Sequence, residues 1–298
     1  MGIRIEMDQQ SIVLPKPSWL KIKPAESSKY KEVKSILTNL KLVTVCEEAH
    51  CPNINECWSG GTATMMVMGD TCTRGCRFCN VKTAKSPLPL DPNEPEKLAQ
   101  AIKQMNLSYV VITSVDRDDL EDQGASHFAK CIEEVRTQSP QTKIEVLIPD
   151  FRGREDLLKI IIDAKPDVLA HNLETVRSLQ KTVRDNRAGY DQSLSVLKFA
   201  KQHNLLTKSS IMLGLGETAE ELQQAFTDLR AAGVDFLTLG QYMRPSQKHL
   251  EVKEYVHPDI FQSLKVKAES LGFRYVVAGP FVRSSYRAGE FFIKAMCK

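Results

Sequence analysis

Six of the eight cysteines fall into two groups of three between residues 46 and 79. The N-terminal triplet is Cys46, Cys51 and Cys57, spaced Cx4Cx5C, and the loop triplet is Cys72, Cys76 and Cys79, spaced Cx3Cx2C. Such spacing lets the sulfurs of each triplet converge on one metal centre. Three thiolates do not complete a tetrahedral zinc site, but they can bind three irons of a [4Fe–4S] cluster and leave the fourth for another ligand. The sequence predicts two metal centres, with zinc and a distant fourth ligand as the alternative.

The composition favours metal binding over a disulfide framework. The chain has 298 residues, 42% hydrophobic and 26% charged, and a net charge of +3 that gives no indication of nucleic acid or an anionic membrane as partner. No apolar run approaches the roughly 18 residues that span a bilayer, and residues 1–23 lack the pattern of an export signal. We therefore expect a cytoplasmic protein, in which thiols stay reduced and available to metals.

The loop triplet resembles the signature of the radical S-adenosylmethionine (SAM) superfamily, CxxxCxΦC, in which Phe78 occupies the aromatic position. The resemblance implies that these three cysteines hold a [4Fe–4S] cluster whose open iron chelates the amino and carboxylate groups of SAM. It further implies that SAM is cleaved reductively to methionine and a 5′-deoxyadenosyl radical. An electron donor such as ferredoxin or flavodoxin is then expected as a partner.

A second motif narrows the resemblance. Together with the N-terminal triplet, the RSSY sequence at residues 283–286 is similar to the lipoyl synthase family, and the similarity extends over about residues 41–290. It implies that four residues hold a second, auxiliary [4Fe–4S] cluster: Cys46, Cys51, Cys57 and, through oxygen, Ser285, with Ser284 as the less favoured choice. Because a serine oxygen is a harder ligand than a thiolate, we expect its bond to iron to be the labile one.

The family resemblance also implies a reaction. It is the insertion of sulfur from the auxiliary cluster at C6 and C8 of an octanoyl-lysine, with two SAM molecules used per product. The substrate would be carried by a lipoyl carrier domain or by the glycine-cleavage H protein, so the site must admit a peptide loop. Two alternatives are a different radical SAM enzyme that inserts sulfur or transfers methylthio groups, which the RSSY motif disfavours, and a non-catalytic zinc protein with an interaction surface.

The elements that position these residues follow from hydrophobic periodicity. Short apolar runs predict strands at Thr64–Met68, Tyr109–Thr113, Ile144–Ile148, Asp167–Ala170, Ser209–Leu213 and Phe236–Leu239. Helical periodicity is found at Lys29–Leu40, Glu96–Gln104, Ala125–Thr137, Glu155–Ala164, Asp191–His203, Ala219–Ala231 and Pro258–Leu271, and another strand is expected at Arg274–Ala278. Strands that alternate with helices predict an α/β fold, a partial (β/α)6 TIM-type barrel. We expect three parts: an irregular cysteine-rich N-terminal extension (1–61), the radical SAM barrel (62–257) and a C-terminal extension with the RSSY motif (258–298).

Ligand-binding residues of such folds follow the carboxyl ends of strands. Asn172 and Glu174 lie two residues apart after the predicted strand 167–170, so both side chains face the same way if the segment is extended. The resemblance implies that they bind the ribose hydroxyls of SAM. The alternative is that they cap the next helix.

Two further pairs are candidates, and their spacing does not separate their members. Arg184 or Arg187 could bind the carboxylate of SAM, because a guanidinium offers a two-pronged donor. Asp116 or Asp118 could accept a hydrogen bond from the SAM ammonium or contact the substrate. A solvated loop is the alternative for both aspartates.

The remaining single residues carry weaker signals. Cys131 lies on an amphipathic helix and is expected to be a small buried hydrophobe. Cys297 stands next to the end of the sequence and is expected to be unstructured. His171 is the one histidine whose position, beside Asn172, suggests a role in the site.

Overall fold

The structure is a computed structural model that describes residues 15–21, 27–290 and 292. Its strands are β1 (Val43–Thr44), β2 (Thr64–Val67), β3 (Thr71–Cys72), β4 (Lys82–Thr83), β5 (Tyr109–Ser114), β6 (Lys143–Leu147), β7 (Val168–Ala170), β8 (Leu206–Leu213), β9 (Phe236–Gln241) and β10 (Tyr275–Gly279). Its α-helices are α1 (Ser28–Leu40), α2 (Val45–Glu48), α3 (Ile54–Ser59), α4 (Glu94–Gln104), α5 (Ala125–Gln138), α6 (Glu155–Asp163), α7 (Gln180–Val183), α8 (Tyr190–Gln202), α9 (Ala219–Ala231) and α10 (Pro258–Ser270). Short 3₁₀ turns lie at Ser18–Leu20, Phe151–Gly153 and Arg177–Leu179.

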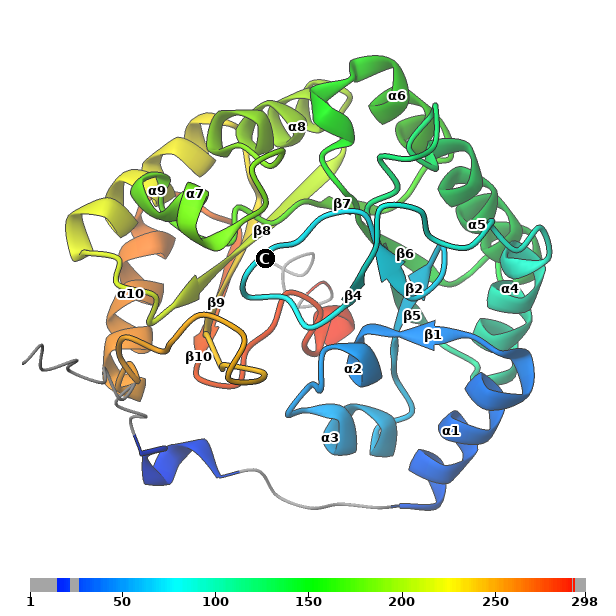
Figure 1. Cartoon of the computed structure of the whole chain (residues 1–298), viewed down its shortest axis with the longest axis horizontal. Helices are drawn as coiled ribbons and strands as arrows, with labels where there is room; N and C mark the ends of the chain where they lie inside the picture. The colour runs from blue at the N-terminus through cyan, green and yellow to red at the C-terminus, as the bar shows by residue number, and fades with distance from the viewer. Residues whose placement is uncertain (1–14, 22–26, 291, 293–298) are drawn as a thin grey trace, which may run out of the picture.

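Eight strands form one sheet in the order β1-β2-β5-β6-β7-β8-β9-β10, and β3 pairs with β4 apart from it. Every neighbouring pair of the large sheet is parallel except β1 with β2. Figure 1 shows the sheet curving around a centre, with α4, α5, α6, α8, α9 and α10 on its outer side. This arrangement confirms the predicted parallel α/β fold, and each of the six predicted barrel strands is present.

Local sequence explains the main elements. The central strands are buried along almost their whole length, which is why they consist of continuous apolar and β-branched runs. Helix α9 begins with a capping box in which Thr218 and Glu221 exchange hydrogen bonds. Strand β2 ends one residue earlier than predicted, because Met68 has a positive φ of 69° and turns the chain toward the loop triplet.

The first part of the chain has more regular structure than the predicted irregular extension. It contains β1, α2 and α3, and β1 pairs with β2 at the register Thr44 to Met65. These elements have only two to six residues, too few for hydrophobic periodicity to reveal. The large sheet takes β1 from the first predicted part of the chain, β2 and β5 to β9 from the second, and β10 from the third. The division into those parts stays a prediction.

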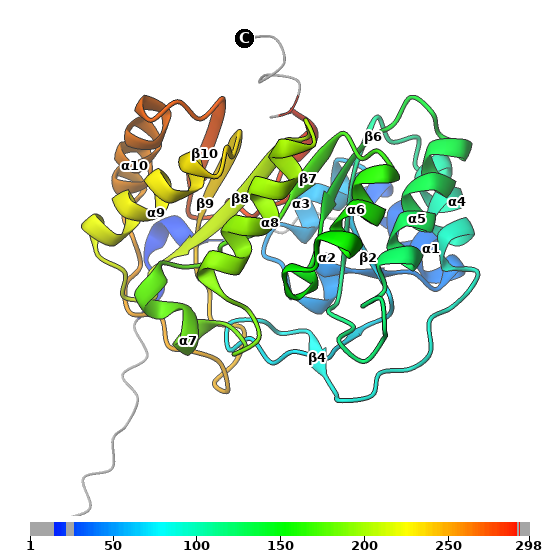
Figure 2. The ribbon, with the colours of Figure 1, turned by 90° about the horizontal axis from the view of Figure 1, so that it is seen from above.

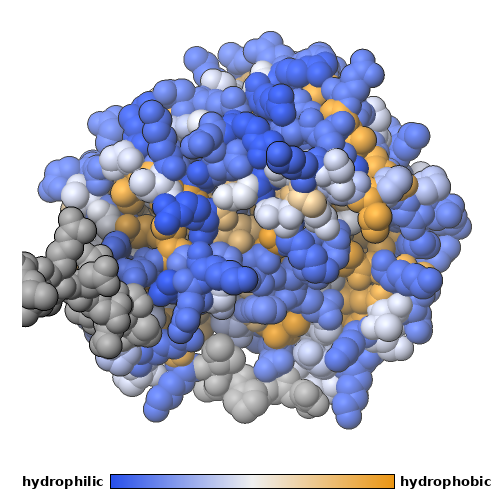
Figure 3. Space-filling model, viewed as in Figure 1, coloured by the Kyte–Doolittle hydropathy of each residue, from blue (hydrophilic) through white to orange (hydrophobic). Residues whose placement is uncertain are grey.

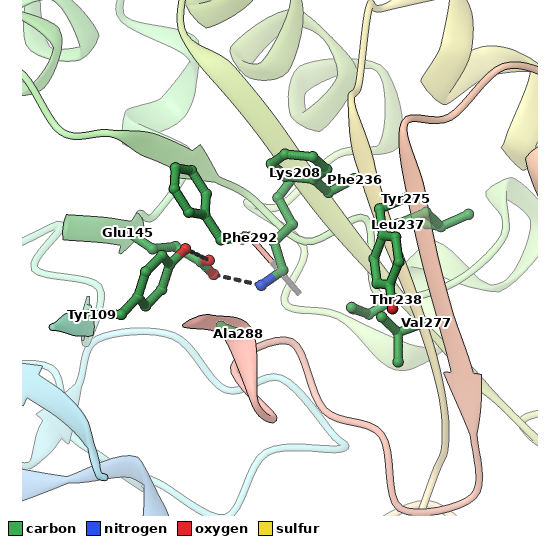
Figure 4. A pocket seen from close by; sticks show the side chains of 10 residues that line it. All are labelled: Tyr109, Glu145, Lys208, Phe236, Leu237, Thr238, Tyr275, Val277, Ala288 and Phe292. Carbon is green, nitrogen blue, oxygen red and sulfur yellow. Dashed lines mark hydrogen bonds and ion pairs between the residues drawn. The ribbon is translucent and has the colours of Figure 1, made fainter. Parts of the chain in front are cut away.

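The two ends of the barrel differ. Figure 2 shows β4 and α7 at one end, which is the carboxyl end of the barrel strands. At the opposite end a pocket is lined by residues near the starts of strands, among them Tyr109, Glu145 and Lys208 (Figure 4). Glu145 pairs with Lys208 at 2.7 Å and accepts a hydrogen bond from Tyr109 at 2.6 Å, and the ring of Phe292 lies 5.4 Å from that of Tyr109. A buried ion pair and aromatic rings therefore fill the amino end.

The face at the carboxyl end is mostly hydrophilic, and hydrophobic residues show there in separate patches (Figure 3). Among the described helices, none has the length and hydropathy needed to cross a membrane.

Candidate metal centres

The loop triplet lies at the carboxyl end of the barrel strands, in the segment that follows β2. Backbone amides point at its sulfurs. Those of Arg74 and Asp116 lie 3.4 Å from Cys72 Sγ, and that of Asp185 lies 3.3 Å from Cys76 Sγ. Amide donors stabilise the thiolate form and are typical of the surroundings of iron–sulfur clusters.

Burial makes these sulfurs neutral thiols when no cation is near. It raises the pKa of Cys72 and of Cys76 to about 12 and also raises the pKa of Cys79. All three are free of disulfide bonds. Because a metal can bind only the thiolate, metal binding here would release protons and supply the charge that burial disfavours.

The donor set of the two triplets suits an iron–sulfur group. Each triplet supplies three cysteine sulfurs, the ligands of [4Fe–4S] clusters, and none of the six is in a disulfide bond. Three thiolates leave a tetrahedral zinc site one ligand short. The compact group of Glu94, His127 and Cys131, whose ligand atoms lie within 4.8 Å of one another, is separate from both triplets.

A buried cation that sequence reasoning missed holds the loop triplet in place. Arg74 binds Asp118 at 2.8 and 2.9 Å, Asp150 at 2.8 Å and Asp116 at 3.2 Å. Asp118 and Asp150 stand 44 and 76 residues from Arg74 in the sequence, so no spacing rule joins them. The loop between the first two cysteines is thereby tied to the loops that follow β5 and β6.

The structure distinguishes the two aspartate candidates. Asp118 is occupied by three arginines: Arg74, Arg152 and Arg187. Asp116 has a carboxylate oxygen 3.7 Å from Cys72 Sγ. Burial raises the pKa of Asp116 to about 6, and the charge of Arg74 opposes that shift. Asp116 is thus the aspartate that faces the loop triplet, whereas Asp118 braces the loop.

Asn172 and Glu174 lie together after β7, as predicted from their spacing. Asn172 Nδ2 donates to Glu174 Oε1 at 3.1 Å, and burial raises the pKa of Glu174. Asn172 Oδ1 is buried without a hydrogen-bond partner in the structure. A buried acceptor that lacks a donor indicates that a ligand supplies one, as a ribose hydroxyl would. The capping alternative is wrong, because the next turn has Val176 as its N-cap, without a side-chain hydrogen bond.

The two arginine candidates lie in different surroundings. Arg184 is buried, is held by Ser193 Oγ at 2.8 Å, and its charge acts to lower the pKa of Glu174 and Cys76. Arg187 is 40% exposed and binds Asp185 at 2.8 Å and the carbonyl oxygen of Thr73 at 2.7 Å. Arg184 therefore adjoins the candidate site, and Arg187 supports the loop from its outer side.

The aromatic residue of the loop signature has a packing role. Phe78 is half-buried and packs with a cluster that contains Val183, Leu215 and Tyr242. This contact fixes the loop triplet to the rim of the barrel at the end of α7.

The N-terminal triplet is built by the two short helices. Cys46 lies on α2, Cys57 on α3, and Cys51 in the turn that joins them. Burial, with a smaller contribution from the neighbouring sulfurs, raises the pKa of Cys46 to about 11 and that of Cys57 to about 12. The structure thus brings these three sulfurs together, as the spacing predicted.

The segment after β10 carries the RSSY motif onto the N-terminal triplet. Three hydrogen bonds join the segment to residues between the triplet's cysteines and to β2: Asn53 Nδ2 to Phe281 O at 2.7 Å, Tyr286 Oη to Glu56 Oε1 at 2.9 Å, and Thr64 Oγ1 to Ser285 Oγ at 2.8 Å. Gly240 permits the crossing, because a Cβ there would lie 2.1 Å from Val282 O. Ser285 is therefore the serine that contacts β2, at Thr64. The backbone amide of Thr64 also hydrogen-bonds the sulfur of Cys46.

The remaining single residues have structural roles. Cys131 is buried in the core, as predicted. Beside it Glu94 pairs with His127 at 2.7 Å and accepts the backbone amide of Met68 at 2.8 Å, which ties α4 and α5 to the end of β2.

His171 uses both ring nitrogens, at 2.9 Å to Ile148 O and at 2.9 Å to Ser193 Oγ. Burial lowers the pKa of His171 to about 4, so it is a neutral core residue and has no free nitrogen for the site. Cys297 lies outside the described residues.

Comparisons with known proteins agree with this geometry. The model of the radical SAM superfamily matches residues 66–229, and that of the N-terminal domain of lipoyl synthase matches residues 4–51. The chain is 59% identical over 283 residues to the lipoyl synthase of Myxococcus xanthus (strain DK1622), covering 94% of this chain and 95% of that protein. It is 56% identical over 290 residues to a chloroplastic lipoyl synthase of Arabidopsis thaliana, covering 95% and 74%.

Solved structures with low sequence identity share the fold. A methylornithine synthase superposes with a TM-score of 0.53 at 12% identity, over 87% of this chain and 81% of that one. A maturase of the [FeFe]-hydrogenase gives a TM-score of 0.56 at 13% identity, over 85% and 62%.

Proposed function

The chain belongs to the lipoyl synthase family of radical SAM enzymes, and on that premise we propose that it inserts sulfur at C6 and C8 of a protein-bound octanoyl-lysine. Family membership makes it an enzyme that uses SAM and [4Fe–4S] clusters. The observation that carries the proposal is the pair of disulfide-free cysteine triplets, together with the RSSY segment that lies against the N-terminal triplet.

The loop triplet would hold the cluster that, with SAM bound to it, supplies the carbon radical. The chain's own part is positioning. Asn172 and Glu174 would accept hydrogen bonds from the ribose hydroxyls of SAM. Asn172 has a buried oxygen that lacks a donor, and Glu174 has a buried carboxyl group. Arg184 pairs with the carboxylate of SAM, and Asp116, beside Cys72, accepts from its ammonium. These groups come from the carboxyl ends of β5 and β7 and from the loop after α7. One end of the barrel would therefore contact SAM from several sides.

The N-terminal triplet and Ser285 would hold the auxiliary cluster, which supplies the inserted sulfur. Ser285 contributes an oxygen in a set that otherwise consists of thiolates. Because oxygen is a harder ligand than thiolate, the bond from Ser285 to iron would be the labile one when the cluster is bound. Tyr286, anchored to Glu56, helps to fix the position of the serine.

The substrate and the reductant are proteins. We propose an octanoylated lipoyl domain or glycine-cleavage H protein as the carrier, and a ferredoxin or flavodoxin as the electron donor, in the cytoplasm. The filled amino end of the barrel, with its ion pair of Glu145 and Lys208, supports entry of the octanoyl chain elsewhere (Figure 4).

Anaerobic turnover tests the proposal. The reconstituted protein is incubated with SAM, a reductant and an octanoylated lipoyl-domain peptide, and the product is read by mass spectrometry. We expect two added sulfurs and about eight irons per chain with no zinc, the content of two [4Fe–4S] clusters. A methylthio product would favour the other radical SAM enzyme, and a cluster-replete preparation without sulfur in its product would refute the proposal.

Two variants separate the centres. Cys72→Ala should abolish SAM cleavage. Cys46→Ala should leave SAM cleavage intact and abolish sulfur insertion, with circular dichroism as the check that both variants fold.

A further inference from the structure

One side chain of β2 lies between two of the proposed ligands of the auxiliary cluster. The backbone amide of Thr64 hydrogen-bonds the sulfur of Cys46, and its hydroxyl Oγ1 lies 2.8 Å from Ser285 Oγ. Among the described residues, Thr64 is therefore the one with hydrogen bonds to both Cys46 and Ser285.

The fold fixes this contact from both directions. The register of β1 on β2, with Thr44 opposite Met65, brings the start of α2 beside Thr64. On the other side, the segment that carries Ser285 is anchored at Phe281 and at Tyr286. Contacts within the protein thus hold both sides of the Thr64–Ser285 pair.

Burial strengthens the contact. Thr64 is 8% exposed, so little water competes for its hydroxyl. The hydroxyl of Thr64 can donate its proton to Ser285 Oγ at 2.8 Å, which leaves the other lone pairs of the serine oxygen free to bind iron. A hydrogen bond to an anionic oxygen is stronger than one between neutral groups and favours the anionic form.

We propose that Thr64 is the positioning residue for Ser285: its hydroxyl donates to the serine oxygen and holds that oxygen in place to bind the fourth iron. The inference rests on the proposed function, because it assumes that Ser285 is the ligand. Thr64 itself donates its one hydroxyl proton to Ser285 and is not a ligand. The strength of this single hydrogen bond then sets how much of the auxiliary cluster carries its serine ligand.

The test compares four variants of the full chain, Thr64→Val, Thr64→Ser, Thr62→Val and Ser285→Ala, each reconstituted with Mössbauer-active iron. Thr64→Val keeps the shape of the side chain and removes the donor, and Thr64→Ser restores it. Thr62→Val is the matched control, because Thr62 is exposed and its hydroxyl binds the carbonyl oxygen of Cys57 at 3.2 Å. The readouts are the fraction of oxygen-ligated iron in the Mössbauer spectrum and the rate at which EDTA removes the first iron. SAM cleavage without octanoyl substrate reports on the other cluster.

Thr64→Val should shift the ratio of serine-bound to serine-free cluster about 10- to 100-fold toward the free form, the effect of losing one hydrogen bond to a charged acceptor. Iron release should quicken, and SAM cleavage should not change. Thr64→Ser should recover most of the bound fraction, and Thr62→Val should match the wild type.

Other outcomes overturn the inference in distinguishable ways. If Ser285→Ala lowers the oxygen-ligated fraction and Thr64→Val does not, Thr64 only packs against the serine and the proposed function stands. If Ser285→Ala changes nothing while Thr64→Val removes the signal, Thr64 is itself the ligand. If neither variant changes the spectrum, serine ligation in the proposed function is wrong as well.

Discussion

Replacing Arg74 by methionine would leave three carboxylates beside the loop triplet without their shared cation. Methionine roughly keeps the length and apolar stem of arginine, so the charge and its hydrogen bonds are the main loss. Asp118 would still be paired with Arg152 at 2.9 Å and with Arg187 at 3.3 Å. Asp150, whose side chain is 0% exposed, would keep the backbone amide of Arg152 at 2.9 Å but lose its ion pair at 2.8 Å.

The magnitude follows from that inventory. Removing one partner of a buried ion pair costs about 3–5 kcal/mol, because a buried charge is left uncompensated. We expect Arg74→Met to lower the free energy of unfolding by this amount, mainly because Asp150 loses its ion pair. The loss is a large share of the roughly 5–15 kcal/mol that stabilise a typical fold. Adding Asp150→Asn removes the orphaned charge and should recover part of the loss, which a double-mutant cycle would measure.

Urea unfolding of the cluster-free chain, followed by circular dichroism, measures the change. The control is Arg177→Met, since Arg177 forms a pair with Asp191 at 2.6 Å on the surface, with side chains 56% and 76% exposed. Such a pair contributes about 0–1 kcal/mol. In the reconstituted enzyme Arg74→Met should also lower the iron bound at the loop triplet. A loss of stability for Arg74→Met no larger than that of the control would refute the reasoning.

Three further predictions follow from the same contacts. Burial acts to raise the pKa of Asp118 and Asp150, but their hydrogen bonds and ion pairs, first among them those with Arg74, lower the pKa of both. The two carboxylates therefore stabilise the fold fully above pH of about 4, and this contribution is lost as the pH falls. Urea midpoints that stay level from about pH 5 to pH 3 would contradict this. Glu174→Gln should raise the KM for SAM about 10- to 100-fold in a cleavage assay, because an anionic acceptor of a ribose hydroxyl becomes neutral; an unchanged KM would remove Glu174 from the site. Gly240→Ala should displace the RSSY segment, because its Cβ would lie 2.1 Å from Val282 O. Iron per chain should then fall from about eight toward four, whereas a full complement would show that the segment adjusts.

The roles that the sequence could not assign depend on long-range contacts. The spacing of Arg184 and Arg187 is equally compatible with either as a ligand of SAM, and the fold separates them by burying one beside Glu174 and exposing the other. The same holds for Asp116 and Asp118. Which member of each pair faces the site depends on how the loop after each strand turns, and no local pattern encodes that.

The amino-acid sequence by itself determined the alternation of strands and helices, the two cysteine triplets and the RSSY motif, because periodicity and close spacing are local properties of a chain. Only the tertiary structure decided that Arg74 joins Asp118 and Asp150, and that Thr64 meets Ser285 across 221 residues. Such pairs form where parallel strands bring distant loops to one edge of the sheet, and buried polar groups must find partners there whatever their distance along the chain.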